Sequence, residues 1–169
     1  AIERQELTLY YQPVINLADQ KIVGFESLLR WFHPEKGTIS PNVFIPIAEE
    51  TGLILPLGDW VLQKATKQLS MWQSEIPDAN IHVSVNLSGK QLVHPDLVDQ
   101  IENAIQQSSI CSSHLKLEVT ESDIINDTET AAAVLQDIKQ LGVGTQMDDF
   151  GTGYSSLSYL HQFPFDVIA

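Results

Sequence analysis

Five oxygen-bearing side chains stand where apolar segments of the sequence are interrupted or end. They are Glu26, Asn86, Glu118, Asp148 and Asp149. In parallel α/β folds ligands bind beyond the carboxyl ends of the strands, so these side chains are expected to converge at one rim. Carboxylates gathered in this way repel one another without a cation, and oxygen ligands suit Mg²⁺, Mn²⁺ or Ca²⁺ better than zinc. The pattern therefore favours a divalent metal site over five independent surface or capping residues.

The adjacent pair Asp148 and Asp149 suggests two metal ions, because one carboxylate can bridge two ions while its neighbour completes the second site. Two ions roughly 3.5–4 Å apart clamp a phosphoryl group and supply its nucleophile. Arg30 follows Glu26 at a spacing that puts both on one face of a strand. Its guanidinium suits either a metal-bound phosphodiester or a salt bridge, and the spacing leaves both interpretations open.

Alternating strands and helices must position these residues. Apolar patterns predict strands at Leu7–Asn16, Lys21–Trp31, Ile81–Leu87, Leu115–Thr120, Val143–Asp149 and Phe165–Ile168, the first two as a hairpin. Helices are predicted at Asn42–Glu50, Gly58–Gln73, Thr128–Leu141 and Ser156–His161. A further helix is predicted to open at a capping box formed by Ser88 and Gln91 and to extend to Ile105. Residues 32–41 are expected to form a loop, and the first four residues to be the tail of a helix. Repeated strand–helix units indicate an α/β fold with a mainly parallel sheet and helices packed outside it.

The composition limits the classes of function. The chain has 22 acidic and 9 basic residues and a net charge of −13. This balance argues against binding to a nucleic acid polymer, but not against a small anionic ligand held by a metal. No apolar run approaches the ~18 residues of a membrane span, and the first residues lack a signal-peptide pattern. We therefore expect no membrane contact by this segment and a cytoplasmic location, which includes the cytoplasmic part of a membrane-anchored protein.

Six runs that contain these residues resemble the EAL family of bacterial cyclic di-GMP phosphodiesterases. In chain order they are YYQPVINL, GFESLLRWFHP, FIPIAEETGLI, VNLSGKQL, LEVTES and DDFGTGYSSLSYL. They extend over nearly the whole chain, so the resemblance does not rest on one short motif. The signature tripeptide is Glu26-Ser27-Leu28, in which serine replaces the usual alanine and the glutamate is kept.

The resemblance implies a modified TIM (β/α)8 barrel with an antiparallel first strand, of which residues 1–169 form a partial EAL domain. It implies that two Mg²⁺ or Mn²⁺ ions are bound by Glu26, Asn86, Glu118, Asp148 and Asp149. Gln12, Arg30 and the backbone near Leu29 would hold cyclic di-GMP, which is hydrolysed at one phosphodiester bond to linear pGpG. Catalytic roles fall to Asp148, Asp149 and Glu121, with Glu121 anchoring the loop from Asp148 to Leu157 at the dimer interface. A homodimer, fused to sensory and nucleotide cyclase domains, is also implied.

Two departures from the family pattern open alternatives. Ala169 stands where the family has a lysine at the catalytic site, and a methyl group neither donates a hydrogen bond nor carries charge. This substitution predicts little hydrolysis but surviving metal and ligand binding. A complete barrel takes about 250 residues, so C-terminal strands are expected to be missing, which would leave a piece prone to pair, swap or aggregate. The candidates are an active phosphodiesterase, a degenerate cyclic di-GMP receptor and, least favoured, a dimerisation module.

Overall fold

A mixed β-sheet forms the centre of the fold in this computed structural model, which describes residues 1–125, 127–149 and 163–168. The strands are β1 (Leu7–Ile15), β2 (Ile22–His33), β3 (Gly37–Ile39), β4 (His82–Asn86), β5 (Leu115–Thr120), β6 (Gly144–Asp148) and β7 (Val167–Ile168). Their order is β1-β2-β4-β5-β6-β7, with β3 attached to β2. β1 and β2 form the predicted antiparallel hairpin, and β2, β4, β5, β6 and β7 run parallel to one another. The α/β class and the antiparallel first strand are therefore confirmed.

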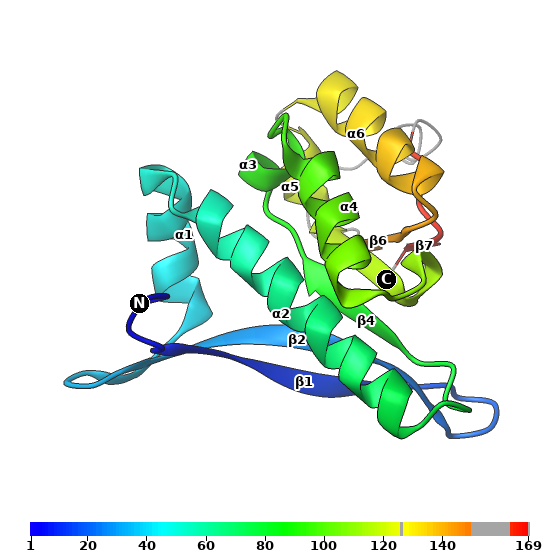
Figure 1. Ribbon diagram of the computed structural model, residues 1–169. Helices are drawn as coiled ribbons and strands as arrows, with labels where there is room; N and C mark the ends of the chain where they lie inside the picture. Colours follow the sequence, from blue (N-terminus) through cyan, green and yellow to red (C-terminus); the bar gives the residue numbers. More distant parts are fainter. Residues whose placement is uncertain (126, 150–162, 169) are drawn as a thin grey trace.

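The helices lie on one side of this sheet (Figure 1). They are α1 (Pro41–Thr51), α2 (Ile54–Glu75), α3 (Gly89–Leu92), α4 (Leu97–Ser108), α5 (Glu121–Ile125) and α6 (Thr128–Gln140), with a short 3-10 turn, η1 (Ser112–His114). Figure 1 shows α2 lying across the β1–β2 ribbon, with α4 beside it. Within the described residues, none of the helices combines the length and the apolar character that a membrane span requires.

The core lies between the helices and one face of the central strands. Alternate strand residues on this face are at most 1% exposed: Val83, Val85, Leu115, Leu117 and Val119. They pack against equally buried residues of α2 and α4, which include Leu62, Leu69 and Ile101. Each such side chain contributes about 1.5–3 kcal/mol by leaving water, so this face holds the sheet and helices together.

Four local expectations were wrong. The capping box at Ser88 opens only the short α3, and the helix that carries Leu97 and Ile105 is a separate one, α4. Part of the expected loop 32–41 forms β3, which pairs with the end of β2 through Trp31, Phe32 and His33. The first residues form a turn rather than a helix tail. A helix that was not expected, α5, follows β5 directly. Each case depends on tertiary pairing or capping that hydrophobic periodicity does not register.

Two edges bound the sheet in the described part of the chain, because β1 pairs there with β2 alone and β7 with β6 alone. A TIM-type barrel that lacks its last strands therefore remains a prediction. The helix expected at Ser156–His161 and the residue Ala169 lie outside the described residues.

Candidate functional site

The sheet register places the predicted metal-binding side chains on one face. Glu26 is level with Gln12 on one side and Ser84 on the other, and Asn86 is level with Glu118. Cross-strand partners point to the same side of a sheet, and alternate residues along a strand do so as well. Since Thr120 is level with Asp148, that carboxylate also points to this face. The face is opposite to the helix-covered core, so its side chains are not needed to hold the helices.

Contacts across this face show which side chains meet. The Asn86 amide donates a hydrogen bond from Nδ2 to Glu26 Oε1 at 2.9 Å, although the two residues are 60 positions apart. Burial raises the pKa of Glu118, the Ser84 hydroxyl opposes this by donating a hydrogen bond, and the charges of Glu26 and Asp148 raise the pKa further. A carboxylate so placed is one that a cation would stabilise. The donor set of acids and an amide thus fits a hard divalent ion.

Asp149 ends this set in an unusual backbone conformation. Its φ is 56°, in the left-handed region that a non-glycine residue rarely adopts, and its N–H donates to Asp148 Oδ1 at 2.9 Å. Asp149 is exposed, whereas Asp148 is half-buried. Among the described residues, no three acid, histidine or cysteine side chains are close enough to form a ready-made metal cluster. The five-residue ligand set therefore remains a prediction.

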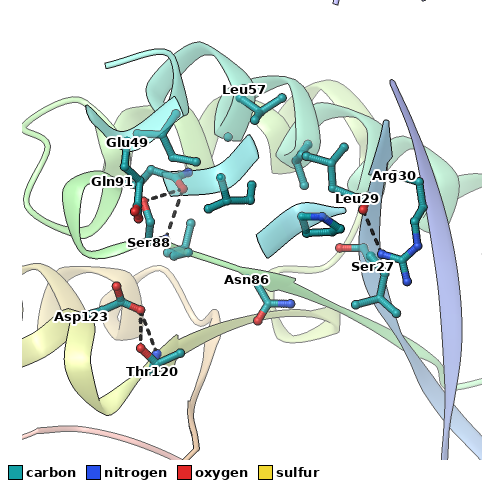
Figure 2. Close-up of a pocket in the computed structure, with 17 residues that line it drawn as sticks. Ser27, Leu29, Arg30, Glu49, Leu57, Asn86, Ser88, Gln91, Thr120 and Asp123 are labelled. Carbon is teal, nitrogen blue, oxygen red and sulfur yellow. Dashed lines mark hydrogen bonds between the residues drawn. The ribbon is translucent and has the colours of Figure 1, made fainter. Parts of the chain in front are cut away.

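A cavity of about 300 Å³ opens beside these residues, between β2 and helices α1, α2, α3 and α5 (Figure 2). It lies where β2 has no strand neighbour on one edge. On that edge β4 pairs with β2 only as far as Ser27, and β3 pairs only from Trp31 onward. The backbone between them, from Leu28 to Arg30, lines the cavity. Unpaired backbone groups at a sheet edge are available to hydrogen-bond a ligand.

Arg30 lines this cavity from β2. Its Nη1 donates to the Leu29 carbonyl oxygen at 2.9 Å, and its guanidinium carbon lies 5.7 Å from the centre of the Tyr10 ring. These contacts orient the side chain and use one of its five N–H donors, which leaves others to bind an anion. The described residues provide no acidic side-chain partner for Arg30 in an ion pair. The role of Arg30 in ligand binding remains a prediction.

The remaining predicted residues are placed as follows. Gln12 is exposed on β1, opposite Glu26 and outside the cavity wall. Glu121 is 6% exposed at the start of α5. The loop that it is expected to anchor lies, after Asp149, outside the described residues. Asn86 is the member of the predicted metal set that also lines the cavity, and it joins the acidic face to the pocket.

Several cavity residues were missed by sequence analysis. Glu49, Gln91, Thr120 and Asp123 all line the cavity. For two of them a signal existed, because Thr120-x-x-Asp123 after a strand is a capping-box pattern that predicts a helix start. Asp123 accepts hydrogen bonds from the Thr120 backbone N–H and from the Thr120 hydroxyl, which forms such a cap at α5. The sequence gave no signal that Glu49 would line a cavity, because Glu49 lies within helix α1 and the packing of that helix over β2 depends on the tertiary structure.

The family model of the EAL domain matches residues 1–169. The chain belongs to the EAL domain family. It is similar to the bifunctional diguanylate cyclase/cyclic di-GMP phosphodiesterase MucR of Pseudomonas aeruginosa, with 45% identity over 164 residues. It is also 40% identical over 168 residues to the cyclic di-GMP phosphodiesterase PdeR of Escherichia coli.

These relatives are much longer than this EAL chain. The matches cover 97% and 99% of the chain but only 24% of MucR and 25% of PdeR. Among solved structures, a complex of the MucR phosphodiesterase with c-di-GMP superimposes with a TM-score of 0.94 at 44% identity. That match covers 99% of this chain and 68% of the other. The EAL enzyme Bd1971, bound to cAMP and cyclic di-GMP, gives a TM-score of 0.91 at 34% identity, with 99% and 46% coverage.

Proposed function

We propose that this EAL domain hydrolyses cyclic di-GMP to linear pGpG with the help of two divalent ions, Mg²⁺ or Mn²⁺. The observation that carries the proposal is the shared sheet face. Glu26, Asn86, Glu118 and Asp148 come from four parallel strands and point to one side, next to a cavity that contains Arg30. Acids at the ends of parallel strands beside a cationic pocket suit a metal-assisted attack on a phosphodiester.

In this proposal, the metal ions would be held by Glu26, Asn86, Glu118, Asp148 and Asp149. When bound, the ions would supply Lewis acidity and the nucleophile for attack on phosphorus. Asn86 would rotate its side-chain amide by half a turn, so that the oxygen instead of the nitrogen faces the metal. The hydrogen-bond network determines which of these two atoms points towards Glu26. The charges of Glu26 and Asp148, which raise the Glu118 pKa, are the charges that the ions would neutralise.

The substrate would be held from the other side by β2. Arg30 would bind a phosphate oxygen, because its planar guanidinium offers several donors to one anion. The open edge of β2 near Leu29 would supply backbone hydrogen bonds, and Gln12 would bind the part of the dinucleotide that leaves the cavity. The Asp148–Asp149 turn and Glu121 complete the catalytic group. The homodimer and the fused sensory and cyclase domains also remain predictions.

A product assay tests the proposal directly. The protein is incubated with cyclic di-GMP and either Mg²⁺ or Mn²⁺, and pGpG is separated by chromatography. We expect pGpG to form with either ion and to be abolished by a chelator. Asp148→Asn should abolish the formation of pGpG, while Asp99→Asn, the same change at an exposed position of α4, should not. Product that persists in the chelator, or in Asp148→Asn, would refute the metal assignment.

A second candidate is a cyclic di-GMP receptor without hydrolysis, which the alanine at position 169 favours. The same protein can be titrated with cyclic di-GMP in the presence of the divalent ion while product is monitored. Tight binding without pGpG supports the receptor, whereas product supports the enzyme. Absence of both leaves a structural role for the domain.

A further inference from the structure

Asp123, at the edge of the cavity, accepts hydrogen bonds from neutral donors on both of its carboxylate oxygens. Its Oδ1 accepts the Gly89 backbone N–H at 2.7 Å. Its Oδ2 accepts the Thr120 backbone N–H at 3.2 Å and the Thr120 hydroxyl at 2.6 Å. Figure 2 shows the Asp123 carboxylate facing Thr120 at the edge of the cavity, with Asn86 nearby. Because both oxygens are engaged by these donors, Asp123 is not arranged as a metal ligand.

The partners of Asp123 belong to the two loops that carry predicted metal ligands. Gly89 begins α3 and follows Asn86 by three residues, and Thr120 ends β5 two residues after Glu118. The Leu87 N–H also donates to the Glu118 carbonyl oxygen at 2.8 Å, which makes a second link between the same loops. The Asp123 carboxylate thus joins the end of β4 to the end of β5.

The backbones of these loops also approach closely. A Cβ atom on Gly89 would lie 2.9 Å from the Asp123 carbonyl oxygen and 3.2 Å from its Cα. Such distances are shorter than ordinary contacts, so only glycine allows α3 to start here without a shift. The carboxylate contacts and this close approach together fix the spacing between the two loops.

We propose that Asp123 is a positioning residue that holds Asn86 and Glu118 at the separation a shared divalent ion requires. The inference rests on the proposed function, because it assumes that both side chains bind metal. Residues that orient metal ligands typically change metal affinity 10- to 100-fold, by order of magnitude, when they are removed. Asp123 would act through the Gly89 and Thr120 backbones rather than by touching the ion or the substrate.

The test measures the binding of Mn²⁺ alone by calorimetry. We expect Asp123→Ala to weaken Mn²⁺ binding by about 10- to 100-fold. Asp123→Asn, which keeps one acceptor oxygen, should give a smaller loss, and Gly89→Ala should also weaken binding because it forces the loops apart. The matched control is Asp127→Ala, since Asp127 accepts the Thr130 N–H as the N-cap of α6 and lies outside the cavity. The Asp127→Ala variant should lose about as much thermal stability as Asp123→Ala does, but its affinity for Mn²⁺ should be unchanged.

The outcomes separate this inference from the proposed function. If the unmodified protein binds Mn²⁺ and forms pGpG, but Asp123→Ala and Gly89→Ala bind Mn²⁺ as well as Asp127→Ala does, the positioning role is wrong and the function stands. If the unmodified protein binds no Mn²⁺, the proposed function itself fails. Should Asp123→Ala not fold, Asp123→Asn and Gly89→Ala give the decision. Weaker Mn²⁺ binding in both, with pGpG formation restored at high Mn²⁺, supports the inference.

Discussion

The two faces of strands β4 and β5 share one backbone but have different side chains and different roles. On the helix-covered face, Val85 and Leu117 are each 1% exposed and belong to the apolar core. On the other face, Asn86 is exposed and Glu118 has its pKa raised by burial and by neighbouring carboxylates. One face therefore stabilises the fold, whereas the other keeps an arrangement that costs stability and suits a cation. The four changes below test this division, from the largest expected effect to the smallest.

Glu118→Gln should separate activity from stability most strongly. Removing the charge of a predicted metal ligand is expected to lower the rate of pGpG formation on the order of 10²–10³-fold, the size of effect seen when a charge-stabilising group is lost. Because the Glu118 pKa is raised, the charged form is disfavoured in the folded protein, and the melting temperature should stay the same or rise.

The rate is measured by chromatography and the melting temperature by circular dichroism. Glu102→Gln, the same change at an exposed site on α4, is the control and should alter neither. A marked loss of stability in Glu118→Gln would show that the open face also holds the fold together.

Leu117→Ala makes the opposite change on the covered face. Truncation of a fully buried leucine should lower the free energy of unfolding by about 2–5 kcal/mol, because packing is lost and a cavity remains. Denaturant unfolding measures this loss. The affinity of the folded fraction for cyclic di-GMP should be unchanged, and a lowered affinity would mean that the two faces are coupled.

Gly24→Ala tests the open face at the end away from Asp148. A Cβ atom at Gly24 would overlap the His82 ring, which packs directly on the glycine backbone. We expect a loss of about 1–3 kcal/mol in the free energy of unfolding, typical of overpacking. Gly144→Ala is the milder comparison, since its nearest atom would be Lys116 Cγ at 3.2 Å. Equal losses in the two variants would contradict the packing argument.

His82 provides the smallest effect, a dependence of stability on pH. Burial lowers its pKa from 6.5 to about 4, the nearby charges of Lys116 and His114 act in the same direction, and a backbone hydrogen bond with Val23 opposes them. The folded protein therefore binds fewer protons than the unfolded chain between these values. Stability from this group is complete above pH 6.5 and is lost as the pH falls towards 4.

Unfolding in denaturant at pH 7.5 and pH 5 measures the change. His82→Gln should lose less stability than the unmodified protein between these two pH values, by a small margin because the ring is only half-buried. An identical loss in both proteins would assign the pH dependence to the carboxylates instead.

Much of the fold could be predicted from the sequence where the signal is local. The alternation in Leu115–Thr120 predicted the observed strand, and the Ser88–Gln91 capping box is present, although it opens α3 and not the longer helix that was expected. The strand β3 was missed because three residues carry no periodicity and become a strand only by pairing with β2. The start of α5 was missed, although the local pattern Thr120-x-x-Asp123 is one that predicts a helix start.

The features of the candidate site also divide into those that the sequence determines and those that depend on the tertiary structure. Sequence by itself determined the residue types, their alternation along each strand and the family, because each of these depends on the chain order alone. Only the tertiary structure decided the register that brings the Asn86 amide to Glu26 and the gap between β3 and β4 that opens the cavity at Leu29. Register and edge pairing depend on how elements distant in the sequence pack together, and local patterns do not contain that information.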